Sequence, residues 1–79
     1  MEYVLNLNNQ KLYAVDVEHD IRLAFFNNRK WLMSGYTAQE ILNMPQSKRL
    51  SKTEVLQITN GIDPEPVRDF LIEQFGLNK

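Results

Sequence analysis

The stretch from residue 50 to residue 77 constrains the fold most, because it carries start and stop signals for two short helices in close succession. Ser51 and Glu54 have the spacing of a capping box, in which each side chain bonds the backbone amide of the other residue. Gly61 suits the left-handed residue that follows a helix end. The sequence therefore predicts a helix from residue 52 to about residue 60.

A second helix is expected to begin directly after this stop. Asp63 is a favoured N-cap residue, and Pro64 fits the first helical position because its missing amide proton would have no partner there. The apolar stripe of this helix and its glycine stop are expected at Val67, Phe70, Leu71 and Phe75, followed by Gly76 and Leu77.

The N-terminal residues have the composition of two β-strands. Residues 3–7 and 12–17 are rich in β-branched, aromatic and aliphatic side chains, and a polar turn separates them at residues 8–11. This pattern predicts a β-hairpin over residues 1–18. Because two strands alone are marginal in water, the hairpin is expected to pack on helices.

Residues 20–33 are interpreted as a helix, because Asp20 can cap its start and Gly35 follows its end. At about 100° per residue, its expected core stripe consists of Ile21, Ala24, Phe25, Trp31 and Leu32.

Phe26 and Met33 fall outside that stripe, and Arg22 and Arg29 lie beside them on the same expected helix. Either the hairpin covers this pair, or the helix exposes an apolar patch rimmed by cations, which is the composition of a binding surface. The hairpin has to pack against something, which favours the covered alternative.

Thr37 and Glu40 form another capping box, which predicts a short helix that ends before Pro45. Residues 43–49 are then expected to be a polar, basic loop. The predicted fold is α+β, with an N-terminal β-hairpin followed by about four short helices. Residues 1–79 are expected to form a single domain, helical from residue 20 onward.

Composition sets further limits on this chain of 79 residues. It has no cysteine, so neither a disulfide nor a thiolate zinc site can stabilise its small core. No apolar run approaches the roughly 20 residues of a membrane span, and the N-terminus lacks the plan of a signal peptide. A cytoplasmic protein without a membrane partner is the expectation.

The sequence offers little for catalysis. Its only cluster with the look of metal ligands is Asp16, Glu18, His19 and Asp20, and the spacing of that cluster matches no known metal site. No serine lies beside the single histidine, and the three glycines are all expected at helix stops or turns, so none builds a phosphate loop. No enzyme activity, cofactor or small-molecule substrate is expected.

Residues 53–71 resemble the helix-turn-helix of bacterial and phage regulators. Gly61 and Ile62 stand where that motif keeps its turn, and Val67, Phe70 and Leu71 stand where it keeps core residues. The resemblance covers about a quarter of the chain. It departs from the motif at Gln57, where a small residue usually lets the helices approach. It implies a regulator, with the second helix in the position of a DNA-recognition helix.

The charges weigh against that use of the second helix. Residues 21–53 carry a net charge of +5, whereas residues 54–79 carry −3, and in the expected second helix and its cap four carboxylates accompany Arg68 alone. Four carboxylates facing phosphates would repel DNA. A DNA-binding face would therefore have to be built elsewhere, from Lys48, Arg49, Lys52, Arg29, Lys30 and Arg68.

The favoured hypothesis is a small regulatory protein that acts by binding another protein, as inhibitors, adaptors and antirepressors of phages and mobile elements do. A second copy of the chain is a further candidate partner. The expected interface combines the apolar pair, its cations and the acidic helix: Phe26, Met33, Arg22, Arg29, Glu65, Asp69, Ile72 and Glu73.

Overall fold

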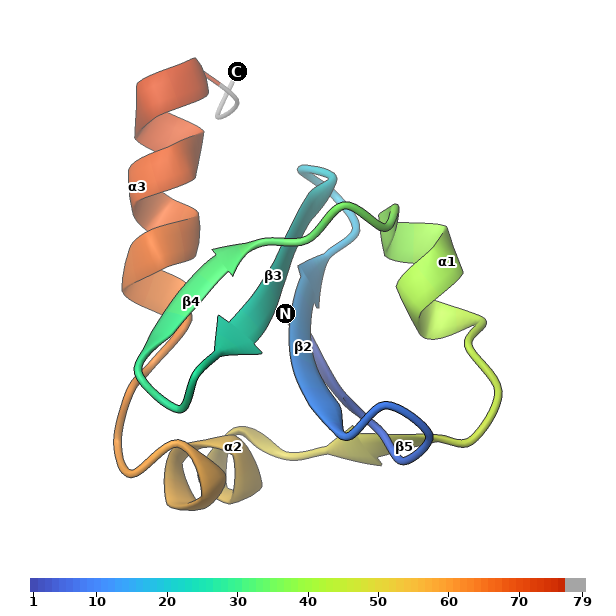
Figure 1. Ribbon diagram of the computed structural model, residues 1–79. Coiled ribbons are helices and arrows are strands. Elements are labelled where there is room, and N and C mark those ends of the chain that lie inside the picture. Colours follow the sequence, from blue (N-terminus) through green and yellow to red (C-terminus); the bar gives the residue numbers. More distant parts are fainter. Residues whose placement is uncertain (77–79) are drawn as a thin grey trace.

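The computed structural model describes residues 1–76, which form a five-stranded antiparallel sheet with three helices (Figure 1). The strand order is β4-β3-β2-β1-β5. In chain order the elements are β1 (Glu2–Asn6), β2 (Lys11–Asp16), β3 (Ile21–Phe26), β4 (Lys30–Met33), α1 (Ala38–Leu42), β5 (Ser47–Leu50), α2 (Lys52–Ile58) and α3 (Glu65–Phe75). The prediction of a hairpin followed by four short helices is wrong.

The first hairpin lies where the sequence predicted it. Strands β1 and β2 pair antiparallel, with Tyr3 opposite Ala14 and Leu5 opposite Leu12. Beyond β1 the sheet is extended by β5, which pairs antiparallel with Leu50 opposite Tyr3. Residues 43–49 were expected to be a loop, but β5 forms from Ser47 to Leu50, a strand that the sequence did not predict.

The largest correction concerns residues 20–33, which form a second hairpin, β3 and β4, instead of a helix. Asn27 and Asn28 both have positive φ, 54° and 55°, and the Arg29 amide donates to the Phe26 carbonyl at 3.1 Å. Two positive-φ residues in succession make the tight turn that suits antiparallel strands. Asp20 also has a positive φ of 52°, whereas an N-cap is extended, so it cannot cap a helix there.

The sheet buries apolar side chains on both faces. One face packs against α2 and α3 and contains Tyr3, Leu12, Ala14, Ile21, Leu23, Trp31 and Val55. The other packs against α1 and contains Val4, Tyr13, Val15, Ala38 and Ile41. We call these the α3 face and the α1 face. This two-sided burial explains why the strands are more continuously apolar than a half-exposed strand would be.

The helix starts and stops of the C-terminal half are largely as predicted. Both capping boxes are formed, at Thr37 with Glu40 and at Ser51 with Glu54. Helix α2 ends at Ile58 with Thr59 as its C-cap, and the left-handed residue after the cap is Asn60, with a φ of 59°, and not Gly61 as predicted. Gly61 follows it with a φ of 87°. The N-cap of α3 is Pro64 and not Asp63, although the Asp63 carboxylate still accepts from the Glu65 amide at 2.9 Å.

Helix α3 presents a different face to the sheet from the one expected. Val67 and Leu71 pack on the core as predicted, but Ile72 joins them, and Phe70 is 61% exposed. Phe75 is also exposed, so it does not continue a buried stripe. Gly76 ends the helix with a φ of 64°, and the expected role of Leu77 lies outside the described residues.

Candidate functional site

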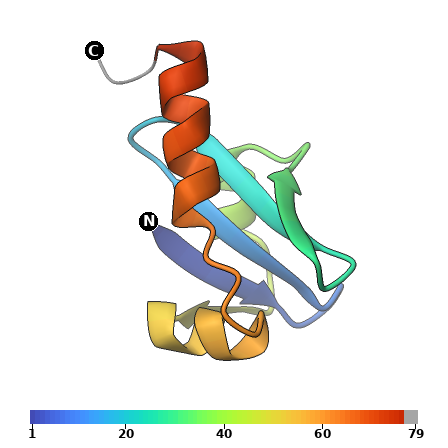
Figure 2. The same ribbon diagram turned by 90° about the vertical axis from the view of Figure 1, so that its left-hand side faces the viewer.

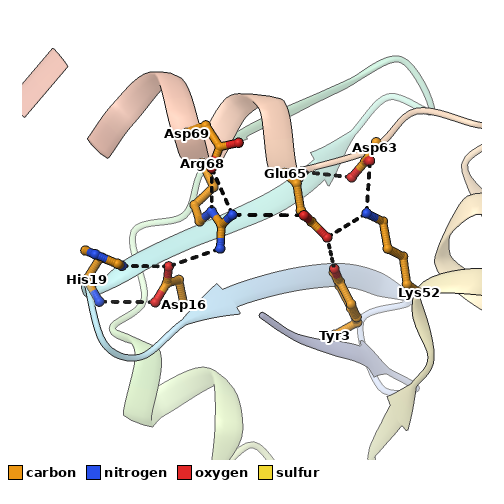
Figure 3. A network of polar contacts seen from close by, with 8 residues as sticks. All are labelled: Tyr3, Asp16, His19, Lys52, Asp63, Glu65, Arg68 and Asp69. Carbon is orange, nitrogen blue, oxygen red and sulfur yellow. Dashed lines mark hydrogen bonds and ion pairs between the residues drawn. The ribbon is translucent and has the colours of Figure 1, made fainter. Parts of the chain in front are cut away.

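A polar network on the α3 face ties α3 to the sheet and to α2 (Figure 3). The Lys52 Nζ lies 2.6 Å from the Glu65 carboxylate and 3.2 Å from that of Asp63. The Tyr3 hydroxyl donates to the same Glu65 carboxylate at 3.1 Å. These contacts join β1, α2 and the start of α3, so Glu65 serves to hold the helix in place.

The second half of the network surrounds Arg68 (Figure 3). Its guanidinium lies 2.8 Å from the Asp69 carboxylate and 3.6 Å from that of Asp16. The Asp16 carboxylate in turn lies 2.9 Å from the His19 Nδ1 and accepts from the His19 backbone amide at 3.1 Å. Arg68 therefore bridges α3 to the end of β2.

The ionisation of the network follows from these contacts. The hydrogen bond from Lys52 lowers the pKa of Glu65. Burial acts to raise the pKa of Asp16, but hydrogen bonds from His19 and the charge of Arg68 outweigh it, so the pKa of Asp16 is lowered. Burial and the bond to Glu65 raise the pKa of Tyr3. At neutral pH the carboxylates of Glu65 and Asp16 are therefore charged and the phenol of Tyr3 is neutral.

Two acidic side chains of the cluster around His19 are engaged in separate ion pairs. Asp16 pairs with His19 and Arg68, and Asp20 pairs with Arg22 at 2.9 Å. Within residues 1–76 there is no group of three or more histidine and acidic side chains placed to hold a metal ion.

The acidic part of the expected interface is only partly available. Glu65 and Asp69 are engaged in ion pairs, and Ile72 packs on the core instead of facing solvent as expected. Glu73 is exposed. The outer side of α3 therefore offers Glu73 beside the exposed Phe70, and the Asp69 carboxylate on that side is already paired with Arg68.

The structure divides the expected nucleic-acid residues between the two edges of the sheet. Lys48 and Arg49 lie on β5 at one edge, and Arg29 and Lys30 lie at the start of β4 at the other. Arg49 pairs with Glu2. Lys52 and Arg68, the remaining two, belong to the polar network. The six cations do not form one continuous basic face.

The β4 edge is the surface with the strongest features of a binding site. Leu32 and Met33 are 41% and 52% exposed on this outermost strand. Figure 2 shows β4 along one margin of the ribbon, and among residues 1–76 only β3 pairs with it. An exposed apolar edge strand is a template for pairing with another chain.

Phe26 and Met33, expected to form one patch, lie on opposite faces of the sheet. Met33 pairs with Leu23, which belongs to the α3 face. Phe26 lies three positions after Leu23 on the same strand, so Phe26 and its partner Lys30 point to the opposite face. Directly opposed residues share a face and successive residues alternate. The surface beside Phe26 is therefore completed by Leu32 and not by Met33, which the helical interpretation could not show.

The outer side of β4 offers unpaired backbone groups. The Ser34 amide donates to the Arg22 carbonyl at 2.9 Å, toward β3. In an antiparallel ladder, residues whose backbone N–H and C=O bond the neighbouring strand alternate with residues whose N–H and C=O point to the opposite side. Counting back from Ser34, Leu32 and Lys30 bond β3, and the amides and carbonyls of Trp31 and Met33 point away from the sheet.

A hollow of about 300 Å³ lies beside this edge at the β3–β4 turn. It is lined by Phe26, Asn27, Arg29 and Lys30. Phe26 is 47% exposed there. The hollow therefore combines an aromatic wall with two cationic side chains, directly before the open stretch of β4.

Trp31 fixes the position of the edge. Its ring is buried on the α3 face, and its indole N–H donates to the Ile62 carbonyl at 2.8 Å. Its ring also lies 5.1 Å from that of Phe25, measured between centroids. A buried side chain thereby connects the edge strand to the segment between α2 and α3.

Comparison with known proteins found no matching family model, no matching curated protein and no matching solved structure. In the part of the chain that the structure describes, no helix has the length and apolar character needed to cross a membrane. The resemblance to helix-turn-helix regulators stays a prediction.

Proposed function

We propose that this is a small non-enzymatic regulatory protein that acts by binding another protein, and that it does so at the β4 edge. The open, apolar edge strand beside a cationic turn carries the proposal. In strand addition, main-chain hydrogen bonds supply affinity and alternate side chains supply specificity. An inhibitor, adaptor or antirepressor of the cytoplasm fits this mode of action.

The rigidity of the edge supports the proposal. The strand is short, four residues, but Trp31 anchors it in the core. A preformed edge avoids the entropy that a disordered segment would lose on binding. A partner strand therefore meets backbone groups that are already aligned.

The alternative, a helix-turn-helix DNA-binding regulator, is less well supported by the charges. The exposed side of α3 carries Asp69 and Glu73, and Lys52 and Arg68 are engaged by carboxylates. Sequence-independent binding of DNA requires uncompensated cations facing phosphates. The alternative would need Lys48 and Arg49, which lie on opposite faces of β5, to bind phosphates from the edge of the strand.

The first experiment compares proteins captured from host lysate by the wild-type chain and by two variants. Leu32→Lys places a charge on the β4 edge and should reduce capture of the specific partner by about ten-fold or more, because edge charges block strand pairing. The matched control, Lys48→Glu, changes a charge at the other edge and should leave capture unchanged.

Equal capture by the Leu32→Lys variant would contradict the proposed function. So would tight binding of random duplex DNA that weakens steeply with salt, because that behaviour indicates phosphate contacts. Circular dichroism of each variant at the capture temperature establishes that a loss of binding is not a loss of fold.

A further inference from the structure

Resting on the proposed function, we infer that the partner supplies an extended acidic segment, which joins the sheet as a sixth strand beside β4. This segment carries an apolar side chain and a carboxylate two residues apart on the side facing the α1 face. The inference names the chemistry of the occupant, which the proposed function leaves open.

The backbone of β4 sets the positions of this segment. The outward amides and carbonyls of Trp31 and Met33 can form hydrogen bonds with an added strand at two places, two residues apart. The side chains that such a strand sets beside Leu32 and Lys30 then fall on the α1 face, because both of these residues point there.

The two positions differ in chemistry. Leu32 is exposed and uncharged, so the side chain beside it should be apolar to remove that surface from water. Lys30 begins the strand and stands opposite Phe26, whose ring borders the hollow. A carboxylate beside Lys30 would lie close to that ammonium group, and Arg29 adds a second positive charge to the lining of the same hollow.

Charge supplies the argument for an acidic segment. Within residues 1–76, neither Arg29 nor Lys30 has a carboxylate at ion-pairing distance, whereas Arg22 on the same hairpin is paired with Asp20. Two unpaired cations at one end of an open edge favour an anionic partner and disfavour a cationic one.

A second copy of this chain is a poorer occupant. If Trp31 of one copy paired with Met33 of the second copy, Lys30 would lie opposite Ser34, which offers no charge. Pairing of two four-residue strands is small beside the roughly 1,200 Å² that a specific interface buries.

The test uses synthetic peptides of roughly ten residues, with threonine at every second position for strand propensity. In the acidic peptide, valine and glutamate alternate at the remaining positions. In the control peptide, lysine replaces each glutamate. A third peptide has the acidic sequence with N-methyl groups on the amides along one edge of the strand, so that these amides cannot donate hydrogen bonds to β4. Binding to the full chain is followed by amide chemical shifts, up to millimolar peptide.

The acidic peptide should bind about ten-fold more tightly than the lysine peptide, with the largest shifts at Trp31 and Met33. The N-methylated peptide should lose this binding. In the Arg29→Glu, Lys30→Glu variant the preference between acidic and lysine peptides should reverse. Both substitutions are at exposed positions, so the variant is expected to fold.

Equal binding of the acidic and lysine peptides would overturn the inference, as would shifts confined to β5 or α3. A β4 edge whose amides are protected without peptide, in a protein that sediments as a dimer, would assign the edge to a second copy. If the peptides fail but capture from lysate still depends on Leu32, the inference fails and the proposed function stands. If capture does not depend on Leu32, the proposed function fails.

Discussion

The two edges of the sheet differ in how they meet solvent, and the difference explains which of them can accept another chain. The β5 edge carries Lys48 and Arg49, one on each face, and both are exposed. The β4 edge carries exposed Leu32 and Met33, with its one charge at the first residue. Charged edges discourage pairing and apolar edges invite it.

The edges also differ in how they are attached to the helices. On the β5 side, Lys52 follows the strand closely and ties α2 to α3 through ion pairs. On the β4 side, the buried Trp31 makes the attachment through packing and one hydrogen bond. One edge is held by charge and the other by apolar burial, so they should respond differently to substitution and to pH.

The largest effect is expected on truncating the apolar anchor. Trp31→Ala should lower the free energy of unfolding by about 3–5 kcal/mol, because it removes a buried ring and leaves the Ile62 carbonyl without its donor. The comparable change at the other edge, Leu50→Ala, should cost about 1–2 kcal/mol since Leu50 is only half-buried. Urea unfolding followed by circular dichroism measures both, and equal losses would contradict the proposed difference in attachment.

The next effect concerns self-association. Lys48→Leu with Arg49→Val should give the β5 edge the apolar character of β4 and raise light scattering at high protein concentration several-fold. Leu32→Lys should lower scattering below that of the wild type. If light scattering changed little in either variant, edge charge would not explain why β4 and β5 differ in their tendency to associate.

The smallest effect is the response to acid. The pKa values of Glu65, Asp63 and Asp16 are lowered in the folded protein, so their stabilisation is present above their unfolded pKa values and is lost as pH falls through the folded ones. The free energy of unfolding should be nearly constant from pH 7 to about pH 5.5 and fall by about 1 kcal/mol toward pH 3, after discounting for solvent screening.

Lys52→Met tests the cause of that response. It removes the cation that lowers the pKa of Glu65, so the loss of stability on acidification should shrink. Trp31→Phe, on the other edge, should lower stability by similar amounts at pH 7 and pH 3.5. Denaturant titrations at pH 7 and pH 3.5 measure the stability of both variants. An unchanged acid response in Lys52→Met would contradict the role assigned to the ion pairs.

Sequence patterns succeeded where the determinants are local. The capping boxes at Thr37 and Ser51 specify hydrogen bonds within four residues, and Gly76 can take the positive φ that ends α3 because it lacks a side chain. The first hairpin followed from strand composition on either side of a polar turn. None of these features needs the remainder of the fold.

The prediction failed at residues 20–33, where two periodicities compete. Ile21, Leu23 and Phe25 alternate as a strand does, but the neighbouring apolar residues also complete a helical stripe. The signal that could have decided between them is Asn27-Asn28, because asparagine accepts the positive φ of a tight hairpin turn. That same error placed Phe26 beside Met33 and concealed the β4 edge.

By itself, the sequence determined the capping boxes at Thr37 and Ser51, the glycine stop at Gly76 and the place of the first hairpin turn. Only the tertiary structure decided that residues 20–33 become two strands, that β5 joins β1 from a polar segment, and that Leu32 stands at an open edge. Strand pairing depends on partners far away in the chain, so local preference cannot fix which strand stays unpaired. The surface on which the proposed function depends is a product of that pairing.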